Sequence, residues 1–300
     1  MLAPGIIINA DDLGIHPRIN AGIVSAYRNG VLTSATLLVT TPYLEQTIRD
    51  AVRAADLPVG IHLSLTLGKA VAPAAEVVDL VDEEGYFKHS ARQLLTRSFG
   101  GESGHRLLGQ IRREVAAQLA LARDWGVTAT HCDSHQHVHM HPAIRAIVEE
   151  ECRSAGINRL RLCREPLPPF AVHLRLLAGL RRMNHAKWLL IRRLARGNPP
   201  SLAATDAFFG LLYSGIMSKP VLRAVLNWAR PDQSLEIGIH PGFPTRAEEL
   251  TRSEAGFAGF ISAAERQEEH DALVDDEIAA LIRRRGLNPR SYDDAAKSAR

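Results

Sequence analysis

The chain has 300 residues, of which 46% are hydrophobic and 23% charged, a composition typical of a globular protein with a substantial core. The formal net charge of +3 is too small to indicate a nucleic-acid partner. The three cysteines form no paired motif, which excludes a disulfide framework and favours a cytoplasmic protein.

No export signal or membrane-spanning helix is predicted. Residues 1–12 lack a basic region followed by a long apolar stretch. The apolar stretch at 207–218 is shorter than the roughly 20 residues that a spanning helix needs.

Short apolar stretches alternate with segments of helical spacing along the chain. The predicted strands are Ile6–Ile8, Thr36–Val39, Val59–Leu65, Thr128–Cys132, Arg159–Leu162 and Leu235–His240. The predicted helices are Ile19–Arg28, Leu44–Ala55, Leu107–Trp125, Ile144–Ala155 and a charged amphipathic outer helix, Ala263–Arg285. This alternation favours parallel strands with crossover helices, in an open α/β sheet or an α/β barrel, with residues 1–300 as one domain.

The middle of the chain interrupts this pattern, and residues 166–230 are predicted to be a basic helical insertion. There is no acidic residue between Glu165 and Asp206, and in 173–196 basic residues alternate with leucines and Trp188. A basic amphipathic helix of this kind is typical of a segment that lies on an anionic membrane surface. The alternative is a helix that packs its leucines on the barrel.

Adjacent carboxylates follow the first predicted strand, in the sequence Asn9-Ala10-Asp11-Asp12. Functional groups of parallel α/β folds collect at the carboxyl ends of strands. A helix cap would account for one of these aspartates. It leaves the second carboxylate unexplained.

Histidines follow three further strands. His62 and His240 each end a Gly-Ile-His sequence, and residues 130–142 contain five histidines and an aspartate. Imidazole is a favoured ligand of zinc and similar ions, so this density indicates a metal site, with a solvated loop as the alternative. Spacing leaves open whether His135 pairs with His139 on a helix or aligns with His137 and His139 in a loop.

One aspartate and two histidines leave coordination positions open on a metal, as in catalytic sites. An open metal polarises a carbonyl and lowers the pKa of bound water. A spare carboxylate and a further histidine can then serve as base and acid. These parts predict metal-assisted hydrolysis of an amide or ester, with zinc favoured by ligand type and magnesium, cobalt or nickel as alternatives. The chain has no G-x-S-x-G sequence that would indicate a serine nucleophile.

Four ordered stretches resemble motifs of the YdjC-like carbohydrate deacetylases, which include the chitooligosaccharide deacetylases. They are NADDLG, GIHLSLTLGK, THCDSHQHVHMHP and IGIHPGF. The resemblance implies a distorted (β/α) barrel that binds one divalent metal ion and removes the N-acetyl group from acetylated amino sugars.

The resemblance also implies roles for individual residues. The implied metal ligands are Asp12, His62 and His135, with Asp11 as general base and His240 as general acid. The candidate substrate-binding residues are Asn9, His137 and His139. The family often has three consecutive histidines where this chain has His135-Gln136-His137, which leaves the role of the middle position open.

The stretch TDAFFGLLYSGIM at 205–217 and the basic insertion are most similar to the hopanoid-biosynthesis-associated branch. This similarity implies N-acetylglucosaminyl hopanoid, a sugar on a polycyclic lipid, as the substrate, with a chitooligosaccharide as the alternative. Expected partners are therefore the acetylated sugar and a membrane surface contacted by 173–196, and a homodimer is among the assemblies considered.

The same clustered aspartates and histidines are also typical of two other functions. One is metal-dependent hydrolysis of another bond, such as a phosphoester, and the other is a non-catalytic metal-binding scaffold at a membrane. The adjacent aspartates argue against the scaffold, because a binding site has no use for a spare base.

Overall fold

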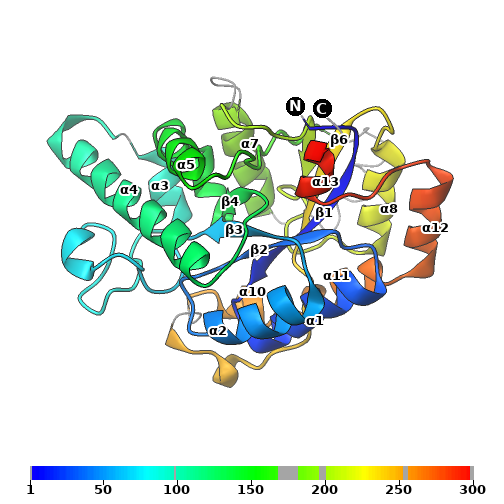
Figure 1. Ribbon diagram of the computed structural model, residues 1–300, viewed down its shortest axis with the longest axis horizontal. Coiled ribbons are helices and arrows are strands. Elements are labelled where there is room, and N and C mark those ends of the chain that lie inside the picture. Colours follow the sequence, from blue (N-terminus) through cyan, green and yellow to red (C-terminus); the bar gives the residue numbers. More distant parts are fainter. Residues whose placement is uncertain (1, 98, 168–181, 196–200, 253–255, 298–300) are drawn as a thin grey trace.

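The computed structural model describes residues 2–97, 99–167, 182–195, 201–252 and 256–297. A curved sheet of six strands lies at the centre, in the order β4-β3-β2-β1-β6-β5, and every neighbouring pair is parallel (Figure 1). The strands are β1 (Gly5–Leu13), β2 (Ser34–Leu37), β3 (Val59–Leu63), β4 (Cys132–Ser134), β5 (Ala207–Phe209) and β6 (Ser234–Ile239). Parallel strands are buried on both faces, and every residue of these six strands is buried.

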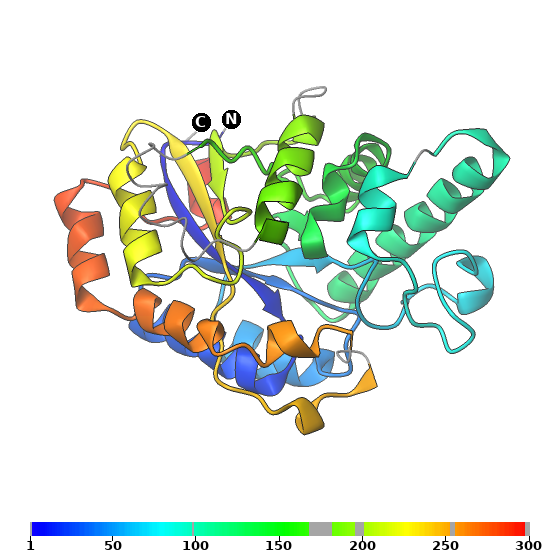
Figure 2. The same cartoon turned by 180° about the vertical axis from the view of Figure 1, so that it is seen from behind.

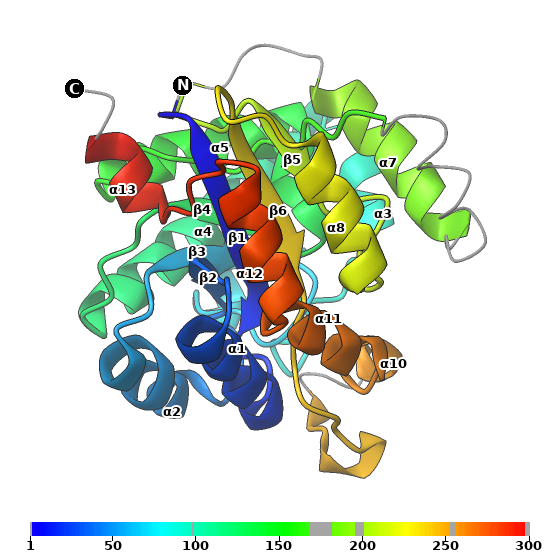
Figure 3. The same cartoon turned by 90° about the vertical axis from the view of Figure 1, so that its right-hand side faces the viewer.

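Helices surround this sheet, as the view from behind also shows (Figure 2). They are α1 (Pro17–Asn29), α2 (Leu44–Thr47), α3 (Ala91–Thr96), α4 (Gly101–Asp124), α5 (Pro142–Ser154), α7 (Arg182–Ala195), α8 (Lys219–Trp228), α10 (Ala258–Ile261), α11 (Glu265–Leu273), α12 (Asp276–Arg284) and α13 (Tyr292–Lys297). Helices α4 and α5 pack side by side near β4, and α8 and α12 pack together near β6 (Figures 1 and 3). Four short helices are η1 (Ile48–Arg53), η2 (Ala74–Glu76), η3 (His135–Met140) and η5 (Ala247–Glu249).

The predicted α/β fold with a distorted barrel is confirmed. The predicted strand Arg159–Leu162 is present only as isolated bridges, Cys132 with Leu160 and Arg159 with Ala203. Through these bridges, residues 159–160 pair with β4 on one side and with Ala203, which precedes β5, on the other. Among the described residues, the chain between the edge strands β4 and β5 therefore pairs irregularly and forms no regular strand.

Further predictions about elements were wrong. The strand expected over Thr128–Cys132 begins only at Cys132, where β4 starts. The single helix expected over 263–285 is divided into α11 and α12, because the Asp275 side chain accepts a hydrogen bond from the backbone of Glu277 and caps a new helix. Strand β5 was not predicted, and it lies within the range assigned to the insertion.

That range also contains α7 and α8, and its treatment as an insertion in one domain stays a prediction. Residues 173–181 and 196 of the basic segment lie outside the described residues. Within the described ranges, no helix is both long and apolar enough to cross a membrane.

Candidate active site

The ends of four parallel strands deliver the predicted polar residues to one buried place. Strand β1 supplies Asp11 and Asp12, β3 supplies His62, the η3 turn after β4 supplies His135, and β6 is followed by His240. None of these five residues is more than 7% exposed. The carboxyl ends of parallel strands share one edge of a sheet, which is why residues so distant in sequence meet here.

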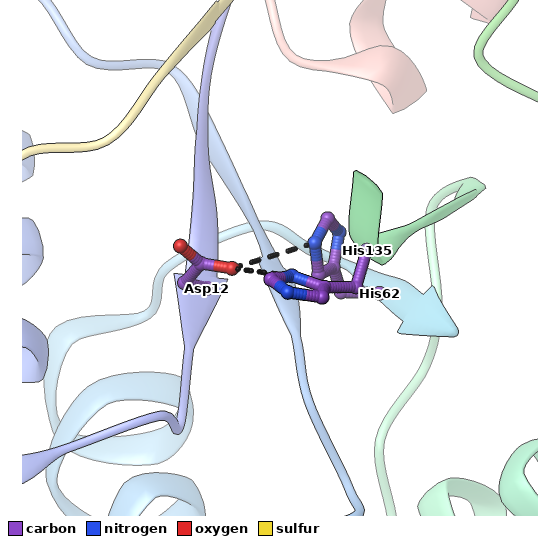
Figure 4. A group of neighbouring side chains, drawn as sticks. All are labelled: Asp12, His62 and His135. Carbon is purple, nitrogen blue, oxygen red and sulfur yellow. Dashed lines mark hydrogen bonds and ion pairs between the residues drawn. The ribbon is translucent and has the colours of Figure 1, made fainter. Parts of the chain in front are cut away.

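Asp12, His62 and His135 form a group that could hold a metal ion (Figure 4). Asp12 Oδ1 lies 3.1 Å from Nδ1 of His135 and 3.6 Å from Nε2 of His62. Ligands about 2.1 Å from a zinc ion at tetrahedral angles are about 3.4 Å apart, so these spacings and this oxygen–nitrogen set suit a divalent cation. Among the described residues, this group offers three protein ligands, which would leave coordination positions for water and substrate.

His62 is oriented by a carboxylate behind it. Its Nδ1 lies 2.7 Å from Oδ1 of Asp133 and 3.1 Å from the Thr36 hydroxyl, which directs Nε2 toward Asp12. Burial opposes a charge on His62, but Asp133, Asp11 and Asp12 together outweigh burial and raise the pKa of His62 to about 9. A carboxylate on the far nitrogen is the usual support of a metal-binding histidine.

Asp12 occupies a backbone conformation that few residues other than glycine adopt. Its φ is 67°, at an irregularity where the pairing of β1 with β2 shifts register between Ala10 and Leu13. Strain of this kind is stored at functional sites. Burial would raise the pKa of Asp12, but hydrogen bonding to His135 and the charge of Arg266, 2.8 Å away, hold that pKa well below its ordinary value.

Asp11 faces a different cation. The Arg161 guanidinium donates to both carboxylate oxygens of Asp11, at 2.7 and 2.8 Å, and also contacts Asp133 at 2.5 Å and Glu236 at 2.8 Å. Arg161 is fully buried, so these charge-assisted hydrogen bonds fix the position of Asp11. A second candidate metal group, Asp11 with His62 and Asp133, is therefore less suitable, because its two carboxylates already bind Arg161.

His240 lies on the other side of Asp11, with Nε2 at 3.9 Å from Asp11 Oδ2. Its backbone NH donates to Oε2 of Glu269 at 2.5 Å, and its Nδ1, 4.0 Å from the same oxygen, makes no hydrogen bond within the described chain. Burial lowers the pKa of His240 to about 4 and raises the pKa of Glu269 to about 7. His240 is thus neutral near pH 7 in this structure.

The three candidate substrate-binding residues bond to the protein itself. Asn9 donates to Asp11 Oδ1 at 3.1 Å and accepts from Ser34 at 2.6 Å. His139 contacts the Ser134 hydroxyl at 2.6 Å and the Arg161 carbonyl at 3.0 Å, and His137 Nδ1 lies 3.5 Å from Cys163 Sγ. Their role in substrate binding stays a prediction.

Two phenylalanines of the segment around α10 cover the histidines. The Phe257 ring meets the His135 ring edge-on at 5.0 Å, and the Phe260 ring meets His240 at 5.2 Å. Arg266 lies beneath Phe260, with its guanidinium carbon 4.4 Å from the ring centre. The site is therefore walled by apolar rings as well as charged groups.

Together, the fold and the site define a parallel α/β protein with a strand-end Asp-His-His group suited to a hydrolytic metal ion. Residues 5–284 match the YdjC-like protein family, and the chain belongs to that family. A solved structure from Enterococcus faecalis V583, described as a cellobiose-phosphate cleavage protein, has a TM-score of 0.72 and 25% sequence identity, with 98% of this chain and 99% of that chain covered.

Curated relatives extend over nearly the whole chain. A carbohydrate deacetylase of Geobacillus stearothermophilus is 32% identical, over 97% of this chain and 98% of its own length. A chitooligosaccharide deacetylase of Salmonella paratyphi B is 30% identical, over 96% and 98% respectively. These relatives confirm the family resemblance and the prediction of an enzyme of the hydrolase class.

Proposed function

We propose that the chain is a metal-dependent N-deacetylase that hydrolyses the N-acetyl group of an acetylated amino sugar and releases acetate and the free amine. One observation carries this proposal: the buried Asp12–His62–His135 group has a separate carboxylate, Asp11, and a separate imidazole, His240, beside it. The names of the relatives, carbohydrate and chitooligosaccharide deacetylases, support the same reaction.

Asp12, His62 and His135 would hold the metal ion. A divalent cation held there polarises the acetyl carbonyl and lowers the pKa of a bound water. Asp11 accepts a proton from the water whose oxygen attacks the acetyl carbon. The two hydrogen bonds from Arg161 hold the Asp11 carboxylate in position for that step.

His240 protonates the nitrogen as the carbon–nitrogen bond breaks. Because this imidazole is neutral near pH 7, it must first receive a proton. Asp11 Oδ2 lies 3.9 Å from Nε2 and would supply this proton once Asp11 has taken it from the water. The two residues would therefore pass one proton from water to the departing amine.

The substitution Asp11→Asn tests these roles. It removes the base and leaves Asp12, His62 and His135 in place, so we expect deacetylation to fall by at least about 100-fold with metal content unchanged. Asp232→Asn, at an exposed position, is the matched control. Loss of the metal from D11N, measured by elemental analysis, would instead make Asp11 the ligand.

We further propose that the substrate is N-acetylglucosaminyl hopanoid, with chitooligosaccharides as the alternative that the curated relatives favour. Mass spectrometry of metal-loaded protein incubated with this lipid or with chitobiose tests the choice. Loss of one acetyl group from only the lipid would support the first substrate. Loss from neither would contradict the deacetylase proposal for both.

A lipid-linked substrate agrees with a peripheral position at the cytoplasmic face of a membrane. On α7, Leu189 is 62% exposed and Arg193 is also exposed, so this face combines an apolar side chain with a basic one. Co-sedimentation with anionic vesicles, compared between the native chain and an Arg192→Glu, Arg193→Glu double variant, tests this contact. Equal binding of both proteins, or of neither, would refute it.

A further inference from the structure

Helix α7 turns one face toward the active site. Asn184 donates hydrogen bonds to the carbonyls of Leu212 and Ser214, both at 3.1 Å, and Trp188 donates to the carbonyl of Glu165 at 3.3 Å. Ile191, one turn further, is fully buried. These residues recur every three or four positions, so they define the inner face of the helix. The same helix contacts η3, the turn that carries His135.

Lys187 lies on this inner face, three residues after Asn184 and four before Ile191. Its side chain is half-buried. Burial lowers the pKa of Lys187, whereas the charges of Cys163, Asp11, Glu165 and Asp12 raise it. The charge of Lys187 adds to burial in lowering the pKa values of His135 and His240. Lys187 thus lies on the inner face of a helix that contacts η3, beside the active site, although this helix belongs to the basic segment.

The carboxylates that Lys187 faces are already bound to other donors. Arg161 takes both oxygens of Asp11, and His135 and Arg266 take those of Asp12. One oxygen of Glu165 accepts two backbone NH groups, and the other has no hydrogen-bond partner among the described residues. Within the same residues, Lys187 itself makes charge–charge interactions only, and no hydrogen bond or ion pair.

An ammonium group carries three donors and no acceptor, so a ligand that satisfies it must offer lone pairs. Sugar hydroxyls and the acetamido carbonyl offer them. We propose that Lys187 is a substrate-binding residue and that its ammonium group donates hydrogen bonds to oxygen atoms of the bound amino sugar. This proposal rests on the proposed deacetylase function and adds a polar contact from α7 to that site.

The charge of Lys187 has an opposite effect on the product. The N-acetyl substrate is neutral at its nitrogen, whereas the free amine formed by the reaction takes up a proton and becomes a cation. A fixed ammonium repels that cation. Lys187 therefore strengthens binding of the substrate and weakens binding of the product.

The test compares Lys187→Met with Lys187→Arg in the metal-loaded full-length chain. We expect K187M to raise KM for N-acetylated chitobiose by roughly 10- to 100-fold, the size of a lost charge-assisted hydrogen bond, and to change kcat much less. The inhibition constant of the deacetylated amine should fall in K187M. K187R, which keeps the charge, should recover most of the native KM.

Arg123→Met, at an exposed position of α4, is the control and should leave both constants unchanged. A merely structural role of Lys187 would lower the melting temperature and shift neither binding constant. Unchanged constants, or constants for substrate and product that change in the same direction, would refute the role of Lys187. If the native chain acts only on N-acetylglucosaminyl hopanoid, the same constants are measured with that lipid. A native chain that deacetylates neither the lipid nor N-acetylated chitobiose would refute the proposed function, and this inference with it.

Discussion

Replacing Arg161 by methionine removes the cation that holds three buried carboxylates together. Its guanidinium binds Asp11 at 2.7 and 2.8 Å, Asp133 at 2.5 Å and Glu236 at 2.8 Å, and none of the four side chains is more than 4% exposed. Methionine occupies a similar volume but leaves these acids without a counter-charge. Breaking a buried ion pair by removing one partner costs about 3–5 kcal/mol. Because three acids share this one cation, we expect the R161M substitution to lower the free energy of unfolding by at least this amount.

In a chain of this size, 1 kcal/mol shifts the melting temperature by about 2–4 °C, so we expect a decrease of roughly 6–20 °C. The difference in melting temperature between the native chain and R161M should become smaller at acidic pH. Burial opposes ionisation of Asp133, but Arg161 and His62 hold its pKa below 3.8, so its stabilisation is present above pH 3.8 and is lost as the pH falls through the lower folded-state pKa. In R161M, Asp133 and Glu236 lose the cation that lowers their pKa values, so these pKa values rise and protonation in acid removes the cost of burying the two charges.

Thermal unfolding of native chain and R161M between pH 4.5 and 8 measures both effects. The matched control is Arg112→Met, because Arg112 also binds two carboxylates, Glu150 and Glu151, but its side chain is 42% exposed. We expect the R112M substitution to lower the free energy of unfolding by less than about 1 kcal/mol. If R161M loses no more stability than R112M, Arg161 is not the counter-charge of this network. The same conclusion follows if the loss of stability in R161M increases at acidic pH.

Three further substitutions have defined outcomes. Asp133→Asn removes the charge behind His62, so metal affinity should fall by about 10- to 100-fold in a metal titration, and unchanged affinity would contradict the orientation of His62 by Asp133. Gly60→Ala would place a Cβ 2.5 Å from the His131 ring and 2.7 Å from the His131 carbonyl, so it should lower the free energy of unfolding in urea by about 1–3 kcal/mol. Gly109→Ala has open space around it and should not lower the free energy of unfolding. Burial lowers the pKa of His131 from 6.5 to about 3, so below pH 6.5 unfolding takes up a proton and stability falls by up to about 1.4 kcal/mol per pH unit. His131→Phe, which can still stack on Tyr292, should reduce that slope, and an unchanged slope between pH 6.5 and 4 would show that His131 is not its source.

The fold was predictable where local pattern and burial agree. The apolar stretch Ile6–Ile8 is at most 2% exposed within β1, and the helix expected over Ile144–Ala155 is found as α5, Pro142–Ser154. Strand β5 was missed because its three residues lie in a longer apolar stretch with no alternation. The segment 159–162 forms only bridges, and it carries the buried charge of Arg161, which no periodic pattern identifies.

The candidate site was predictable where residues that act together are close in sequence or end similar strands. The adjacent aspartates and the two Gly-Ile-His sequences are signals of this kind. The arginines are not, because Arg161 binds Asp11 from 150 residues away and Arg266 binds Asp12 from 254 residues away. Asp133 was within the histidine-rich motif, but its contact with His62 depends on the pairing of β3 with β4.

Arg161 and Arg266 help to assign separate roles to Asp11 and Asp12. Each carboxylate has its own cation, Arg161 for Asp11 and Arg266 for Asp12, so their mutual repulsion is offset without a metal ion. The two are nevertheless not equivalent. Both oxygens of Asp11 are bound by Arg161, whereas Asp12 presents Oδ1 to two imidazoles and only Oδ2 to Arg266. A metal ion could bind Oδ1 of Asp12 without displacing an arginine, but coordination by Asp11 would compete with Arg161. This asymmetry supports the proposed assignment of Asp12 as ligand and Asp11 as base.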